Sequence, residues 1–279
     1  MKLSRPETVA DAVAALGNGS VALAGGTEVV PLLRDGILRA DTLVELRRVV
    51  PKGIDGTTVG AGTTLAELEV DPEIPDVLRE ACRLAASPQL RNVSTIGGNL
   101  LQATRCWYWR LQFPCWLHGG EVCHAREGVH REHAIFANDR CASAHPSDVA
   151  AALIALGATL RTDRRELGVA DLYRLPTDDD RETTTLAQDE LILELDVPRP
   201  HASTYLKAMD RKRWAFALVG VAAARFDGGV RLALAGVAPV PWPLSGPEAL
   251  DEATPLPGTV YKVEVARALI RRAFGAVSG

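Results

Sequence analysis

Apolar residues recur at helical and strand spacings along the first ninety residues and predict a small α/β unit. After Pro6, three apolar residues spaced by three or four positions precede Gly17 and predict a short helix. The predicted helices span residues 7–16, 28–33, 65–70 and 74–86, and the predicted strands span 20–24, 42–46 and 57–61. The first sixty residues are therefore expected to form a βαβ-type unit.

The second half of the chain has longer strand patterns and two strong helix patterns. Residues 146–156 predict a helix, with Pro146 early, Asp148 in the first turn and an apolar face. Further strands are predicted over 158–162, 190–197, 204–208, 215–226 and 230–237, with a hairpin turn at 227–229 and a closing helix over 263–274. The polar, acidic stretch 177–185 predicts a surface or domain-joining loop. These patterns predict an α+β fold with a boundary near residues 165–180.

Composition and charge exclude several classes of protein. With 47% hydrophobic and 24% charged residues, 279 residues can bury an ordinary core. The net charge of -4 argues against a nucleic-acid partner. No apolar run approaches the roughly 18–20 residues that span a bilayer. The N-terminus has no apolar signal core and no twin arginine. We therefore expect a cytoplasmic protein, or a periplasmic one exported with a partner that carries the signal.

Four of the five cysteines lie in one segment, Cys106–Cys141, together with three of the five tryptophans and most of the histidines. Such a concentration of soft ligands and rings favours a metal centre on an inserted loop over a disulfide framework, which suits small secreted domains. The fifth cysteine, Cys82, lies on an apolar helix face and is predicted to be a buried thiol.

The cysteine spacing alone does not identify the metal. Eight, seven and seventeen residues separate the four cysteines, and no C-x-x-C pair is present. Zinc is one alternative, with His118, His124, His130 or His133 as further ligands. The loop's rings could wall off an iron–sulfur cluster from water or form a small satellite core; they are Trp107, Tyr108, Trp109, Phe113 and Trp116.

Two glycine pairs each stand where a strand or loop leads into a helix. Gly25-Gly26 follows the strand at 20–24, and Gly97-Gly98 lies within 94–99. Such turns expose backbone N–H groups to a phosphate, although a tight turn or close crossing of segments explains each one equally well. The G-x-G-x-x-G fingerprint is absent, so a dinucleotide would bind in a fold other than the Rossmann fold.

Four motifs occur in order: AGGTE (24–28), GAGTT (60–64), LRNVSTIGGN (90–99) and YLKAMDR (205–211). Together they resemble the FAD-binding medium subunit of the molybdenum hydroxylases, the family of xanthine dehydrogenase, aldehyde oxidoreductase and carbon monoxide dehydrogenase. The resemblance covers nearly the whole chain. It implies a two-subdomain α/β FAD-binding domain over residues 1–170 and a C-terminal α+β domain with an antiparallel sheet over 171–279.

The resemblance also implies cofactor contacts. The residues that would line the FAD pyrophosphate are Ala24, Gly25, Gly26, Thr27 and Glu28 in the first turn, and Thr95, Ile96, Gly97, Gly98 and Asn99 in the second. Asp148 would bind the flavin nucleotide, and Ile192 and Lys207 would lie near the isoalloxazine ring. Asp148 could equally be a helix N-terminal acid and Lys207 a solvated strand lysine.

About forty residues separate the second glycine motif from the helix that begins near Asp148, far more than in most relatives. This insertion, at about 103–145, resembles the loop that carries an extra [4Fe-4S] cluster in 4-hydroxybenzoyl-CoA reductase and in a bacterial aldehyde oxidoreductase. The resemblance implies four thiolate ligands, Cys106, Cys115, Cys123 and Cys141.

We therefore expect an FAD- and [4Fe-4S]-binding electron-transfer subunit of a heterotrimeric molybdenum hydroxylase that oxidises an aldehyde, an N-heterocycle or an aromatic compound. The resemblance implies a molybdenum-cofactor large subunit, a small subunit with two [2Fe-2S] clusters, and an external carrier such as NAD, ferredoxin or oxygen. No catalytic acid or base is predicted, because the flavin performs the chemistry. The alternatives are a zinc-stabilised scaffold subunit without flavin and a stand-alone flavoprotein reductase.

Overall fold

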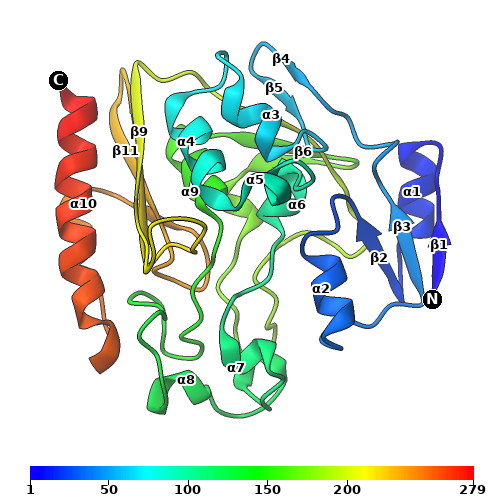
Figure 1. Ribbon diagram of the computed structural model, residues 1–279, viewed down its shortest axis with the longest axis horizontal. Coiled ribbons are helices and arrows are strands. Elements are labelled where there is room, and N and C mark those ends of the chain that lie inside the picture. Colours follow the sequence, from blue (N-terminus) through cyan, green and yellow to red (C-terminus); the bar gives the residue numbers. More distant parts are fainter.

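Helices fill the space between two β-sheets, and a third, smaller sheet lies at the N-terminal end of the molecule (Figure 1). The computed structural model describes all residues, 1–279. The arrangement is mixed α and β with antiparallel sheets, as predicted. No helix of the molecule is both long and apolar enough to cross a membrane.

The N-terminal sheet is parallel and has the strand order β1-β3-β2. Its strands are β1 (Lys2–Ser4), β2 (Ser20–Leu23) and β3 (Thr42–Glu45), and its helices are α1 (Val9–Ala15) and α2 (Val29–Arg34). Thr8 and Asp11 form a capping box at the start of α1. The predicted βαβ unit is therefore present, but it ends at β3.

The predicted third strand belongs to a different sheet. β5 (Thr58–Gly60) pairs with β4 (Ile54–Asp55) and with β8 (Ile192–Asp196), far along the chain. The five-stranded sheet has the order β4-β5-β8-β6-β7, completed by β6 (Thr159–Thr162) and β7 (Glu166–Gly168). β8 thus pairs with strands of the first 170 residues, whereas the division into 1–170 and 171–279 stays a prediction.

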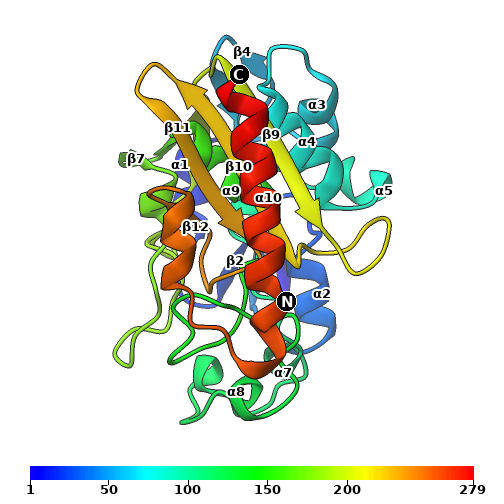
Figure 2. The same ribbon diagram turned by 90° about the vertical axis from the view of Figure 1, so that its left-hand side faces the viewer.

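The four-stranded antiparallel sheet has the order β12-β11-β10-β9. Its strands are β9 (Ala202–Ala208), β10 (Val219–Phe226), β11 (Gly229–Ala235) and β12 (Trp242–Leu244). β10 begins at Val219, four residues later than predicted, because residues 209–218 form the loop that follows β9. The long C-terminal helix α10 (Val260–Ser278) lies across one face of this sheet (Figure 2).

The opposite face of the same sheet is lined with alanine, which allows a helix to approach closely. In β10, Val219 and Val221 face α10, whereas Ala222 and Ala224 face α9 (Asp148–Leu156). Almost every residue of α9 is buried, as expected of a helix that is apolar on all sides. Together with α3 (Leu65–Val70), α4 (Asp76–Ala85) and α6 (Ile96–Leu100), α9 joins both larger sheets in one core.

The cysteine-rich insertion contains only short helical turns and projects at one end of the molecule (Figure 1). These turns are α7 (Trp107–Arg110), the 3-10 turn Trp116–His118 and α8 (His124–Glu127). The remaining short helices are α5 (Pro88–Arg91) and the 3-10 turns Ala170–Leu172, Pro247–Glu252 and Pro257–Thr259.

Candidate cofactor site

The two predicted glycine turns lie directly against each other. A Cβ atom on Gly25 would lie 1.9 Å from the carbonyl oxygen of Val93, so only glycine fits there. The Ser94 hydroxyl also donates a hydrogen bond to the Thr27 hydroxyl, at 3.1 Å. The structure therefore brings together two motifs that are about seventy residues apart in the sequence.

The first turn leaves backbone N–H groups without a partner. No hydrogen bond within the chain uses the amides of Gly25, Gly26, Thr27 or Glu28, which lead into α2. Gly26 has a φ of +75°, a conformation that favours glycine. A run of unpaired amides at such a turn suits an anion such as a pyrophosphate, so this part of the prediction has the required donors.

The second turn is held in place by the GAGTT segment. Thr95 caps α6 by accepting a hydrogen bond from the Gly98 amide, at 3.2 Å. The amides of Ile96 and Gly97 donate to the carbonyls of Thr63 and Ala61, at 2.9 and 3.0 Å. Most amides of this turn are therefore occupied, and its glycines serve close backbone packing more than anion binding.

Asn99 connects the second turn to the helix that carries Asp148. The Ser147 hydroxyl donates to Asn99 Oδ1 at 2.6 Å, and the same hydroxyl caps α9 by accepting from the Ala150 amide at 2.9 Å. The start of α9 is thereby fixed relative to the glycine turns.

Asp148 and Lys207 face each other in the core. Lys207 Nζ lies 2.7 Å from Asp148 Oδ2, and both side chains have at most 1% of their surface exposed. Tyr205 Oη donates to the other carboxylate oxygen, and Lys207 also donates to the Leu84 carbonyl. Burial raises the pKa of Asp148, although the bonds from Lys207 and Tyr205 oppose that rise. Lys207 is therefore not a solvated strand lysine.

Ile192 lies in β8 with its side chain buried in the main core. Its neighbour Leu193 accepts a hydrogen bond from the Ala61 amide at 2.8 Å, and Ala61 in turn packs against Gly97. Ile192 is thus on the strand that supports the second glycine turn. The structure brings the predicted contacts into one contiguous region, and their individual roles toward FAD stay predictions.

Glu28 connects the first glycine turn to the cysteine-rich insertion. Its carboxylate lies 2.6 Å from Arg105 and 2.5 Å from Arg110, and it accepts a hydrogen bond from the Ala103 amide. Both arginines are mostly buried, and Arg110 also donates to the Thr104 carbonyl. The two arginines were missed, because ion pairs between residues 75 or more positions apart leave no spacing signal.

All four cysteines of the insertion line a single small cavity and are free thiols. Apolar and aromatic side chains complete the wall, among them Tyr108, Trp109, Trp116, Leu117 and Ala125. No three His, Cys, Asp or Glu side chains lie close enough together to hold one metal ion. Cys82 lies elsewhere and is fully buried, as predicted; burial raises its pKa.

Short helical turns begin at three of the four cysteines. Cys106, Cys115 and Cys123 each occupy the N-terminal cap position of such a turn, and the backbone amides that follow each cysteine act to lower the pKa of its thiol. Burial raises the pKa of Cys106 to about 11. A hydrogen bond from the Cys141 thiol lowers the pKa of Cys123 to about 5 and raises that of Cys141.

Of the four histidines considered as zinc ligands, only His133 contacts a cysteine. Its Nε2 lies 3.2 Å from Cys106 Sγ. His118 bonds to the Trp109 carbonyl and His130 to the Ala125 carbonyl, whereas His124 lines the cysteine cavity without a hydrogen bond to its Nε2. Trp107 packs edge-on against His133 instead of facing the cysteines.

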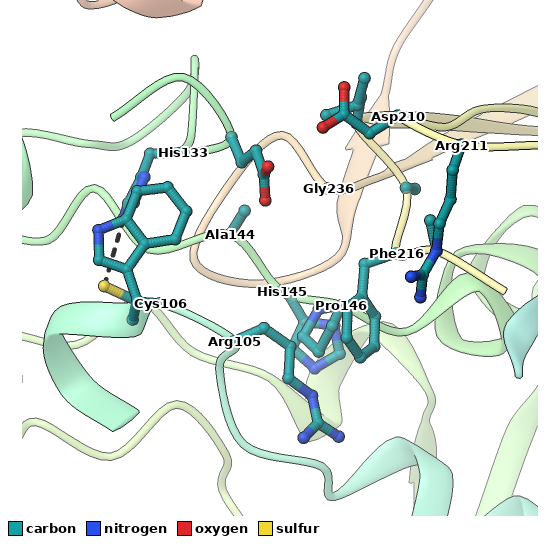
Figure 3. A pocket seen from close by; sticks show the side chains of 15 residues that line it. Arg105, Cys106, His133, Ala144, His145, Pro146, Asp210, Arg211, Phe216 and Gly236 are labelled. Carbon is teal, nitrogen blue, oxygen red and sulfur yellow. Dashed lines mark hydrogen bonds between the residues drawn. The ribbon is translucent and has the colours of Figure 1, made fainter. Parts of the chain in front are cut away.

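A second cavity lies between the insertion and the loop that follows β9 (Figure 3). Arg105, Cys106 and His133 line it from the insertion, and Arg211 and Phe216 line it from the loop. The Arg105 guanidinium lies over the Phe216 ring, 4.9 Å from its centroid. This cavity adjoins the first glycine turn only through the Arg105–Glu28 pair.

The insertion is docked on the C-terminal part of the chain. The amides of Ile135 and Phe136 both donate to the Val237 carbonyl. Lys262, from α10, is fully buried and donates to the carbonyls of Glu132 and Gly236, at 2.8 and 2.9 Å. The insertion is thus attached both to the N-terminal part of the chain, through Glu28, and to the C-terminal part, through Val237 and Lys262.

Comparison with known proteins gives one family and several relatives. Residues 1–200 match the family described as FAD binding domain in molybdopterin dehydrogenase. The chain is 36% identical over 253 residues to the aldehyde oxidoreductase FAD-binding subunit PaoB of Escherichia coli K12, covering 83% of this chain and 79% of the relative. It is also 36% identical over 107 residues to the carbon monoxide dehydrogenase medium chain of Hydrogenophaga pseudoflava, covering 34% and 37%.

Solved structures share the fold. A carbon monoxide dehydrogenase from Hydrogenophaga pseudoflava superposes with a TM-score of 0.73 at 23% identity, covering 100% of this chain and 97% of the other. Quinoline 2-oxidoreductase from Pseudomonas putida 86 gives a TM-score of 0.68 at 18% identity, covering 100% and 97%. At these identities the likeness concerns the fold alone, and it extends over the entire chain.

Proposed function

The chain belongs to the family of FAD-binding domains of molybdopterin dehydrogenases, and on this basis we propose that it is the FAD- and [4Fe-4S]-binding electron-transfer subunit of a heterotrimeric molybdenum hydroxylase. Membership makes it an oxidoreductase subunit. The [4Fe-4S] part of the proposal rests on the four cysteines that line one cavity.

The glycine turns fit the FAD pyrophosphate. Four consecutive unpaired amides, from Gly25 to Glu28, offer the donors that two phosphates need. The second turn, Thr95–Asn99, directly follows Val93 and Ser94, which contact the first turn, and would form the second wall of the site. When bound, FAD supplies the ring that takes up and releases electrons, and the protein supplies position and electrostatics.

The cysteine cavity suits an iron–sulfur cluster. Four thiolates are the ligand set of a [4Fe-4S] cluster, in which each cysteine binds a different iron and the sulfurs surround a volume. The backbone amides that point at the sulfurs would stabilise the negative charge of a bound cluster. The aromatic wall would keep water away from it.

Zinc fits this arrangement less well. A structural zinc site gathers four ligands at about 2.0–2.3 Å around one ion. No three candidate ligands of this chain are gathered so closely, and only one histidine touches a cysteine. The donor set therefore favours the cluster over a zinc-stabilised scaffold.

The partners and substrate belong to the assembled enzyme. We propose a molybdenum-cofactor large subunit and a small subunit with two [2Fe-2S] clusters, with electrons passing through this chain to an external acceptor. The relatives are named as subunits or medium chains, which supports a multi-chain enzyme. The long match to an aldehyde oxidoreductase subunit supports an aldehyde as the substrate.

The test is the cofactor content of the purified complex, measured as flavin, iron and acid-labile sulfide. We expect one FAD and one [4Fe-4S] cluster per copy of this chain, beyond the iron of the small subunit. Cys115→Ser and Cys123→Ser should remove about four irons and leave FAD bound, because they alter only the insertion. Cys82→Ser is the matched control and should leave iron unchanged, since its thiol lies in the core.

Other results would point to the alternatives. Zinc without additional iron or sulfide would favour the scaffold, particularly if flavin were absent as well. A yellow chain that purifies without partners and reduces an acceptor by itself would favour a stand-alone flavoprotein reductase.

A further inference from the structure

One histidine of the insertion, His133, contacts the cysteine that lines both cavities. The His133 side chain has only 1% of its surface exposed, and its Nε2 lies 3.2 Å from Cys106 Sγ (Figure 3). Cys106 lines the cysteine cavity and also the cavity beside Arg105, which His133 lines with it. Arg105 in turn pairs with Glu28 of the first glycine turn. Cys106 is thus the ligand on the flavin side of the proposed cluster.

The direction of this hydrogen bond follows from the chemistry of a metal-bound cysteine. A cysteine that binds iron is a thiolate and has no proton to give. The contact therefore requires that Nε2 carries the hydrogen, and that Nδ1 of the neutral ring carries none. Nδ1 is buried and has no hydrogen-bond partner, so no donated hydrogen bond is lost when Nδ1 carries no hydrogen.

The ring is held in this position by its surroundings. Trp107 packs edge-on against it with the ring centroids 4.8 Å apart, and the His133 amide donates to the His130 carbonyl at 2.9 Å. The preceding carbonyl, of Glu132, accepts from the buried Lys262. The side chain is therefore fixed before any cluster is bound.

The other three cysteines have a different set of donors. Cys123 Sγ accepts a hydrogen bond from the Ala142 amide at 3.4 Å and another from the Cys141 thiol, the Cys141 thiol lies 3.3 Å from the Ser143 hydroxyl as a donor, and no histidine bonds to any of these three sulfurs. A histidine N–H at Cys106 makes this ligand unlike the rest. Hydrogen bonds to sulfur stabilise the reduced, more negative cluster and raise its reduction potential.

We propose that His133 is a positioning residue for the cluster. Its Nε2–H donates a hydrogen bond to the thiolate of Cys106, the ligand on the flavin side, and thereby raises the reduction potential of the [4Fe-4S] centre. This rests on the proposed cluster. Its consequence is that the cluster accepts electrons more readily than the backbone amides alone would allow.

The experiment is a redox titration of the intact purified complex, followed by the electron paramagnetic resonance signal of the reduced [4Fe-4S] centre. His133→Leu removes the donor, and we expect the ratio of reduced to oxidised cluster at a fixed potential to fall about tenfold, equivalent to about 59 mV for one electron. His133→Gln places an amide N–H near the original Nε2, and should restore most of the wild-type ratio. His118→Gln is the matched control, because its ring bonds to a carbonyl and touches no sulfur.

The outcomes separate this proposal from the one it rests on. An unchanged potential in His133→Leu with full iron content would overturn the role of His133. So would loss of the cluster from both His133 variants when the His118 control retains it, since His133 would then only hold the loop. If the wild-type complex has no [4Fe-4S] signal, the proposed function itself fails.

Discussion

Lys262, on α10, is completely buried. Its Nζ donates to two backbone carbonyls, one in the insertion and one after β11. Burial lowers its pKa to about 7; the carboxylate of Glu132 opposes this lowering, and the like charge of Arg131 adds to it. A lysine in such a place connects three segments through hydrogen bonds, but its buried charge destabilises the folded state.

This gives a prediction for stability against pH. The unfolded chain holds the Lys262 proton up to about pH 10.5, whereas the folded chain releases it near pH 7. Between these values the unfolded state binds more protons, so the free energy of unfolding should rise with pH. Below pH 7, where Lys262 is charged in the folded chain, the destabilisation caused by burying this charge is fully present. At about 1.36 kcal/mol per pKa unit, the rise amounts to a few kcal/mol.

Urea unfolding of the purified chain from pH 7 to 9.5 measures this effect. Lys262→Met loses both hydrogen bonds at every pH, but it should also lose the Lys262 contribution to the rise. The exposed Lys212→Met is the control and should keep the wild-type slope. If the free energy of unfolding of Lys262→Met rose with pH as steeply as that of the wild type, Lys262 would not have the lowered pKa in the folded chain.

At the scale of elements, the long periodic segments and short strands such as β2, β3 and β6 were predicted within a few residues, whereas several strands of two or three residues and the pairing of distant strands were not. The sequence patterns of α4, α9, β9, β11 and α10 lie close to the observed elements. Strands of two or three residues, such as β1 and β4, are too short to show a period. The pairing of β5 with β8 was missed because register between distant strands is set by the completed core.

The site follows the same division. The glycine turns and the cysteines were identified from residue type and resemblance, because few other residues serve those purposes. The ion pairs of Glu28 with Arg105 and Arg110 carry no local pattern and appeared only in the structure. The turn between β2 and α2 is therefore both the proposed phosphate site and an anchor for the insertion.

Replacing Gly25 should disturb both roles of this turn. In Gly25→Ala the new Cβ would meet the Val93 carbonyl at 1.9 Å, so the two turns must separate. We expect overpacking to cost about 1–3 kcal/mol of unfolding free energy, with most FAD lost from the purified complex. Gly228→Ala, in the β10–β11 hairpin, meets nothing within 4 Å and should retain both flavin and stability. If Gly25→Ala retained its full flavin content, the close contact between Gly25 and the Val93 carbonyl would not be needed for FAD binding.

On the scale of the whole molecule, three cores are arranged around the helical layer, and the insertion is attached at separate places. Glu28 holds its beginning, and Val237 and Lys262 hold its later part. The cysteine cavity, the Arg105 cavity and the glycine turns follow one another through shared residues. This arrangement suits the proposed relay of electrons between a cluster and FAD.

The purified chain by itself should accordingly fail to oxidise an aldehyde or an N-heterocycle. It should still pass electrons when reduced chemically, because the proposed redox centres need no substrate. Steady-state assays with a dye acceptor, comparing the lone chain with the full complex, measure the difference. Aldehyde oxidation by the lone chain at a rate similar to that of the complex would disprove the relay role.

The attachment of the insertion to Val237 and Lys262 has a consequence for synthesis of the protein in the cell. The ribosome completes Cys141 on the order of 120 residues before Lys262, which is roughly 6–24 s at about 5–20 residues per second. Throughout that interval the four thiols have no surface to dock on and are open to oxygen and to competing metals. Loading of the proposed cluster would therefore be a late event that follows synthesis of the C-terminal helix, and a maturation factor that delivers iron would have to recognise the finished chain and not the nascent one.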